Sequence, residues 1–90
     1  MQETPDVMYF RALAEALEQG NSKLEAGMIA KAHVVGFARG YVKSRGYPVN
    51  VLRNVMEYVN CDVWKAMDIL EVPHELRTLV FIAVTEQYKP

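Results

Sequence analysis

The stretch TPDVMYFRALAEALEQGNSKLE, residues 4–25, decides the fold, because it holds one complete set of helix boundary signals and the start of another. Thr4 is a typical N-cap, Pro5 suits the first helical position, and Gly20 suits the position just beyond a helix end. These signals predict a helix over about residues 5–19. Four apolar residues recur in it with the helical period and define one apolar face: Val7, Phe10, Ala14 and Leu17.

The rest of the chain continues with signals of the same kind. Ser22 and Glu25 have the spacing of a capping box, and the helix that they open should run over about residues 23–44 and stop at Gly46. An extended Tyr47–Pro48 dipeptide should follow. Three further helices are expected from their apolar positions: a third at Val51, Leu52, Val55, Met56 and Val59, a fourth (about residues 62–70) at Val63, Ala66, Met67 and Leu70, and a fifth (about residues 74–87) at Leu76, Leu79, Val80, Ala83 and Val84.

The composition is that of a globular protein. About half of the 90 residues are hydrophobic and 23% are charged, without an internal repeat or a low-complexity stretch. A single cysteine, Cys61, cannot form an internal disulfide, and neither a signal peptide nor an apolar run long enough for a membrane helix is recognisable. We therefore expect one cytoplasmic domain, residues 1–90, folded as a compact all-α bundle of about five helices. Because so short a chain has a small core, we also expect a homo-oligomer.

The charges are sorted along the chain. Residues 1–25 and residues 57–90 each carry a net charge of −3, whereas residues 26–56 carry +5 and no acid. The basic segment could bind phosphate, pair with the acidic flanks of its own chain or of a partner subunit, or form a solvated helix end. Its candidate nucleic-acid-binding residues are Arg39, Lys43, Arg45 and Arg53.

Small residues form a stripe on the second predicted helix. Ala32, Gly36 and Gly40 recur every four residues, and Ala12 and Ala16 form a similar stripe on the first helix. Such stripes allow backbones to approach closely, which compensates for the low helix propensity of glycine. The stripe therefore predicts close packing against the first helix or against a symmetry mate; a kinked helix is the alternative.

The segment NVMEYVNCDVWKAMDIL, residues 54–70, resembles a helix-turn-helix, with Asn60 at the turn position that favours a left-handed conformation. We expect this helix-turn-helix-like unit around residues 51–70. Three acids and one cation lie on the second helix and its border: Asp62, Asp68, Glu71 and Lys65. This acidic surface would repel a phosphate backbone, so the unit is a poor DNA reader.

Trp64 lies on the same acidic helix. If its ring faces outward, it suits a protein contact, because aromatic residues are frequent interface anchors. The alternative is that Trp64 covers the small core of the domain.

The sequence RNVMEYVNCDVWKAMDILEVPHELR, residues 53–77, resembles the C-terminal tail of some members of the recombination-promoting nuclease (transposase) family. The matching residues are Ala66, Met67, Asp68, Leu70, Val72, Pro73 and Glu75. The resemblance implies a helical tail module for association or regulation. It carries over no catalytic residue, because the nuclease motif of that family lies in a separate domain and this chain has no Glu-x-Lys triplet.

Signals of enzymatic chemistry are missing from the sequence. His33 and His74 are isolated, Cys61 has no base beside it, and there is no glycine-rich phosphate loop or metal-ligand spacing. We therefore expect no catalytic residue, no cofactor and no metal. The sequence favours a non-enzymatic protein-interaction or regulatory module that acts as a homo-oligomer. The alternative is a small nucleic-acid-binding regulator, transcriptional or from a mobile element, that uses the basic segment 31–53.

Overall fold

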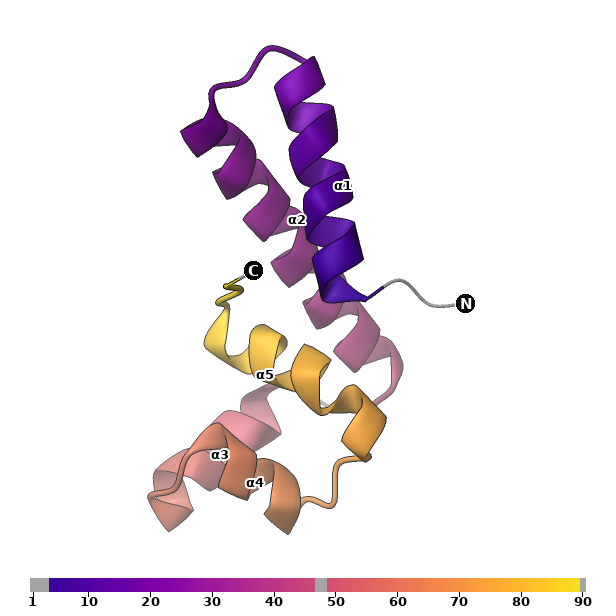
Figure 1. The fold of residues 1–90 in the computed structure, drawn as a ribbon. Coiled ribbons are helices and arrows are strands. Elements are labelled where there is room, and N and C mark those ends of the chain that lie inside the picture. The colour runs from indigo at the N-terminus through magenta and orange to yellow at the C-terminus, as the bar shows by residue number, and fades with distance from the viewer. Residues whose placement is uncertain (1–3, 47–48, 90) are drawn as a thin grey trace.

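The computed structural model describes residues 4–46 and 49–89, and these residues contain only helices and connecting turns. Figure 1 shows their arrangement. The elements are α1 (Pro5–Glu18), α2 (Lys23–Ser44), α3 (Val49–Val59), α4 (Val63–Ile69), a short 3-10 helix η1 (His74–Leu76) and α5 (Arg77–Thr85). The predicted all-α class with five α-helices is confirmed, whereas the predicted Tyr47–Pro48 dipeptide lies outside the described residues.

The helix ends lie where the boundary signals placed them. The Thr4 hydroxyl accepts a hydrogen bond from the Val7 N–H at 3.2 Å. Ser22 and Glu25 make both hydrogen bonds of the capping box, and α2 begins and ends at the predicted residues. Gly20 has φ +93°, the left-handed conformation that favours glycine after a helix end.

The molecule is elongated, with dimensions of 46 × 28 × 18 Å. The helices α1 and α2 form an antiparallel hairpin, α5 packs on the C-terminal half of α2, and α3 and α4 pair at the far end (Figure 1). The main core therefore lies around the C-terminal half of α2. Its largest fully buried side chains are Leu52, Met67, Val34, Val42, Val72 and Val80.

The helix-turn-helix-like unit consists of α3, the turn at residues 60–62 and α4. Asn60 has φ +58°, which confirms the left-handed turn position. Asp62 then caps α4 by accepting a hydrogen bond from the Lys65 N–H at 2.8 Å. The fifth predicted helix is shorter than expected, because it opens as the 3-10 turn η1 and ends where Glu86 takes φ +56°.

The apolar face that the sequence suggested for α1 does not face the core. Val7, Phe10 and Leu17 are exposed, with 57% of Phe10 accessible to solvent, and α1 instead buries Met8 and Ala16. Two apolar stripes share the helical period on α1, and the stripe through Met8 and Ala16 is the one that packs inward. Among the described residues, no helix has both the length and the apolarity that a bilayer requires.

Candidate functional site

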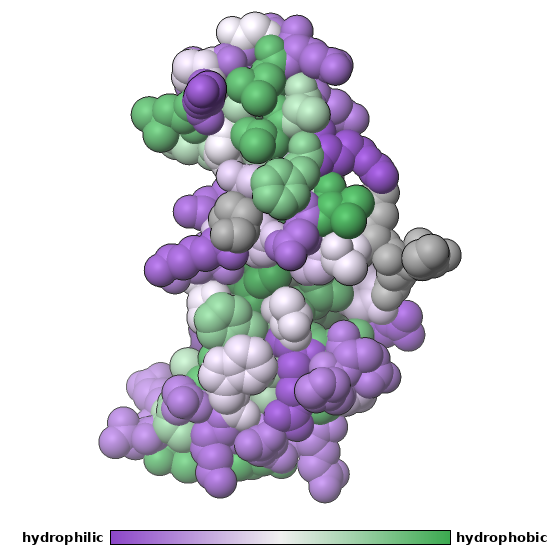
Figure 2. Space-filling view, viewed as in Figure 1, coloured by the Kyte–Doolittle hydropathy of each residue, from purple (hydrophilic) through white to green (hydrophobic). Residues whose placement is uncertain are grey.

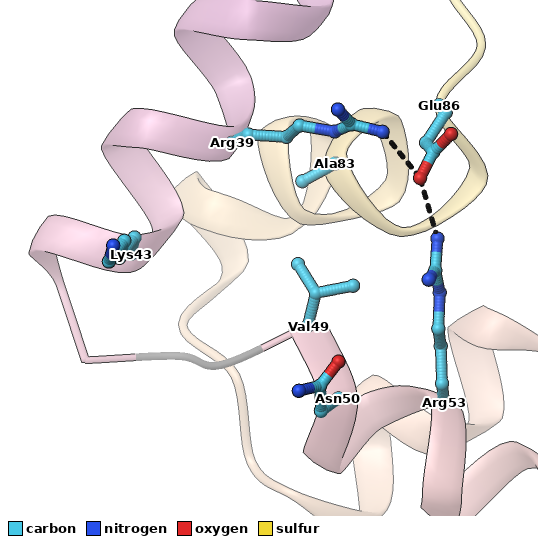
Figure 3. Close-up of a pocket in the computed structure, with 7 residues that line it drawn as sticks. All are labelled: Arg39, Lys43, Val49, Asn50, Arg53, Ala83 and Glu86. Atoms are coloured by element: carbon cyan, nitrogen blue, oxygen red, sulfur yellow. Dashed lines mark hydrogen bonds and ion pairs between the residues drawn. The ribbon is translucent and has the colours of Figure 1, made fainter.

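A surface pocket of about 370 Å³ lies between the C-terminal half of α2, the start of α3 and the end of α5. Figure 3 shows its seven lining residues. Arg39 and Lys43 are one helical turn apart on α2, so their side chains share one face of that helix. The other lining residues are Val49, Asn50, Arg53, Ala83 and Glu86.

The Glu86 carboxylate joins two of these cations. Its Oε1 forms an ion pair with Nη2 of Arg39 and lies 2.8 Å from Nη2 of Arg53 (Figure 3). Arg53 also donates a hydrogen bond to the carbonyl oxygen of Val84 at 3.1 Å. All three charged side chains are about half exposed, so water screens the two ion pairs.

The pocket keeps a positive charge at neutral pH. The hydrogen bond from Arg53, followed by the charge of Arg39, lowers the pKa of the Glu86 carboxyl below its ordinary value, so this group stays ionised. The lining then contains three cations and one anion. Among the described residues Lys43 has no ion pair, so its charge is not compensated.

Three of the four predicted basic residues therefore come together, and the fourth does not. The Arg45 guanidinium lies 5.1 Å from the centre of the Tyr41 ring and donates a hydrogen bond to the Tyr41 hydroxyl at 3.0 Å. Arg45 follows Lys43 by two residues, which is about 200° around a helix, so it points to the opposite side. Glu86 was not among the predicted site residues, although pairing of the basic segment with an acidic flank was one of the stated alternatives.

The small residues of α2 do not pack against α1. Ala32, Gly36 and Gly40 are exposed, and a Cβ added at either glycine would meet no atom within 4 Å. Packing against the first helix, one of the two predicted contacts, is therefore wrong for this stripe. Close packing against a symmetry mate stays a prediction.

These small residues continue a longer apolar row on the exposed side of α2, and we call this set the outer stripe. Its members are four residues apart, so the outer stripe winds by about 160° around α2 from its first residue to its last. It lies about 200° around the helix from the residues that α2 buries: Ala26, Ala30, Val34, Ala38 and Val42. Leu24 and Met28 are 76% and 64% exposed. On the face shown in Figure 2, green apolar side chains gather over the α1–α2 hairpin in the upper half of the view. The outer stripe consists of Leu24, Met28, Ala32, Gly36 and Gly40.

Trp64 combines features of both predicted roles. Its ring stacks on Phe81 of α5, with ring centroids 5.2 Å apart and an interplanar angle of 20°. At the same time 46% of the residue remains exposed. Trp64 therefore covers the edge of the core with one side of its ring, and the interface role stays a prediction.

The remaining candidate groups lie apart. His33 and His74 are exposed and Cys61 is half-buried, and no three metal-binding side chains come together within residues 4–46 and 49–89. Comparison of the chain with protein-family models, with curated proteins and with solved structures gives no match. The resemblance of residues 53–77 to a nuclease-family tail therefore stays a prediction.

Proposed function

We propose that the protein is an interaction module that works as a homodimer, in which the outer stripe of α2 of one copy contacts the outer stripe of the other. The observation that supports this proposal most strongly is the exposed, uncharged centre of the outer stripe, which consists of Met28, Ala32 and Gly36. Water solvates such a surface poorly, and its burial against a second apolar surface is favourable.

The order of residue sizes in the outer stripe supports a second copy as the partner. An antiparallel pair of α2 helices that cross at about 50° on a two-fold axis at Ala32 aligns the two rows of residues four apart and places Met28 opposite the partner's Gly36. Leu24 and Gly40 point about 80° away from the centre of this contact. The large side chain of Met28 thus fills the space that the partner's Gly36 leaves open. A two-fold interface requires this kind of self-complementary surface.

Disulfide trapping in a Cys61→Ser background tests both the contact and its direction. Ala32→Cys should give a covalent dimer, because the axis brings the two α-carbons into the range of about 4.4–6.8 Å that a disulfide needs. Leu24→Cys alone should give no covalent dimer. The antiparallel arrangement places the two Leu24 positions sixteen residues apart along the helix axis, or about 24 Å. Met28→Cys combined with Gly36→Cys should trap the dimer. Trapping by Leu24→Cys alone would mean a parallel pair and would contradict the proposal.

Sedimentation equilibrium provides a second test without new cysteines. The unaltered chain should sediment at twice its mass of 10.2 kDa, and Ala32→Glu should reduce this to one chain by placing two charges at the axis. The matched control is Ala14→Glu, which adds the same charge to the exposed outer face of α1 and should leave the dimer intact. A chain that is monomeric at all concentrations would refute the proposal.

Nucleic-acid binding is the second candidate function, and it is favoured by one observation, the gathering of Arg39, Lys43 and Arg53 around one pocket. Only Arg39 and Lys43 share a helix face, and Glu86 already neutralises part of their charge. We expect weak, salt-sensitive binding. Tight binding to DNA or RNA at physiological salt in an anisotropy titration, lost in the Arg39→Glu, Lys43→Glu double variant, would promote this function.

A further inference from the structure

We propose that the pocket between α2, α3 and α5 binds the phosphate group of a small molecule, which displaces the Glu86 carboxylate from Arg39 and Arg53. This proposal is independent of the homodimer, because the lining residues do not include any residue of the outer stripe.

The position of Glu86 shows that an anionic oxygen fits between the two guanidinium groups. A single carboxylate oxygen contacts an arginine from α2 and an arginine from α3, although these two side chains come from different helices. Arginine binds carboxylate and phosphate oxygens with the same planar set of N–H donors. The Glu86 carboxylate therefore marks the place that a ligand oxygen would take.

The Glu86 contact can open at small cost. Both ion pairs are about half exposed, and ion pairs of this kind contribute little to stability. Rotation of the exposed Glu86 side chain is enough to move its carboxylate away, so the two arginines become available without disturbing the core.

The charge of the site selects the class of ligand. Glu86 is a carboxylate tethered beside the arginines, so a free monocarboxylate would have to compete with a permanently high local concentration of the same group. A phosphate dianion brings twice the charge. It would also meet Lys43, whose charge is uncompensated among the described residues, so the phosphate gains attraction that Glu86 does not use.

The shape of the pocket indicates a small molecule rather than a nucleic-acid strand. Its volume of about 370 Å³ is within the range of small-ligand sites. Val49 and Ala83 give it an apolar part, and the opening residues of α3, Val49 and Asn50, bring the positive end of that helix to the lining. A strand would need cations in a row along its backbone, but Arg45 lies on the other side of α2.

The test is a titration of the full chain with inorganic phosphate and with phenyl phosphate, at constant ionic strength, followed by ¹H–¹⁵N correlation spectra. Saturating shifts should concentrate on the amides of Val49, Asn50, Ala83 and Glu86. Phenyl phosphate should bind more tightly than inorganic phosphate, because its ring can contact the apolar part of the pocket. Acetate at the same concentration should cause no saturating shift.

A pair of matched variants makes the test specific. Glu86→Gln removes the competing charge and should tighten phosphate binding about tenfold. The control, Glu71→Gln, removes an acid that has almost the same backbone conformation, φ +53°, but does not line the pocket, and it should leave the affinity unchanged. Arg39→Gln should abolish the saturating shifts while the dispersion of the spectrum reports an intact fold; if Arg39→Gln unfolds, Lys43→Gln should weaken binding in its place.

Three outcomes would overturn the proposal. Equal effects of Glu86→Gln and Glu71→Gln would show that only the net charge of the protein matters. Equal shifts with acetate and phosphate would remove the selection for a dianion. Sub-micromolar binding of a DNA duplex through the same amides would assign the pocket to nucleic acid.

Discussion

Replacing the two exposed glycines of α2 by alanine should stabilise the isolated chain. Gly36 and Gly40 lie in the interior of α2, where glycine costs about 1 kcal/mol of helix propensity relative to alanine. An added Cβ at either position meets no atom within 4 Å, so no steric penalty offsets this gain. The double variant Gly36→Ala, Gly40→Ala should therefore raise the free energy of unfolding by about 2 kcal/mol.

Urea denaturation measures this change directly, at a protein concentration low enough for the monomer to dominate. With an m-value of about 1–3 kcal/mol/M for a small domain, the midpoint should rise by roughly 1 M. The control is Gly46→Ala, the same substitution at φ +78°, which should lower the free energy of unfolding by about 1 kcal/mol. A fall of the midpoint for the α2 double variant in the monomer would refute the reasoning, because it would mean that the glycines are in close contact within the chain.

The same double variant separates folding from assembly. In the proposed antiparallel dimer, Gly36 lies opposite the partner's Met28, so the methyl group added at Gly36 occupies space that a partner side chain needs. The dissociation constant of the dimer should therefore increase while the monomer becomes more stable. An improved dimer would contradict the antiparallel arrangement.

Three further predictions concern other parts of the chain. Ser22→Ala should lower the free energy of unfolding by about 1 kcal/mol in urea denaturation, because the Glu25 N–H loses its capping partner. Met67→Ala, which empties a fully buried site, should cost about 2–5 kcal/mol in the same assay. Burial, followed by the hydrogen bond to Asp6, raises the pKa of Tyr88 to about 12, so stability from this hydroxyl is present below its ordinary pKa of 10.0 and is lost as the pH rises toward 12. The stability difference between the unaltered chain and Tyr88→Phe should therefore shrink between pH 10 and 12, and a constant difference would contradict this assignment.

Boundary signals predicted the helices well because the interactions behind them are local. The capping box joins residues three apart, and the left-handed turn at Asn60 depends on the conformational preference of one residue. The inward residues predicted for α4 are buried or half-buried, since a short helix with one apolar stripe has one way to bury it. For α5 the prediction missed Ile82, which is buried, because six consecutive apolar residues leave its inward face ambiguous. For α1 the period alone was ambiguous, because its second stripe, through Met8 and Ala16, has the same spacing.

The candidate site was predictable only in part, since it depends on contacts between distant segments. Arg39 and Lys43 share a helix face because they are four residues apart. The same helical spacing places Arg45, two residues after Lys43, on the opposite side. The contact between Glu86 and Arg53 spans 33 residues, and no local pattern indicates it. Charge sorting along the sequence correctly suggested pairing between the basic segment and an acidic flank, but it could not identify which acid takes part.

The hairpin itself gives a physical reason to expect assembly. Near the turn between α1 and α2, the hairpin is held together by three buried alanines that lie apart from the main core: Ala16, Ala26 and Ala30. Alanine buries little apolar area, so this contact contributes much less than the Leu52 and Met67 region at the other end of the molecule. Larger apolar side chains of the same two helices point outward instead. A second copy seated on the centre of the outer stripe would bury Met28, and would thereby add stabilisation that the alanine contact alone does not supply.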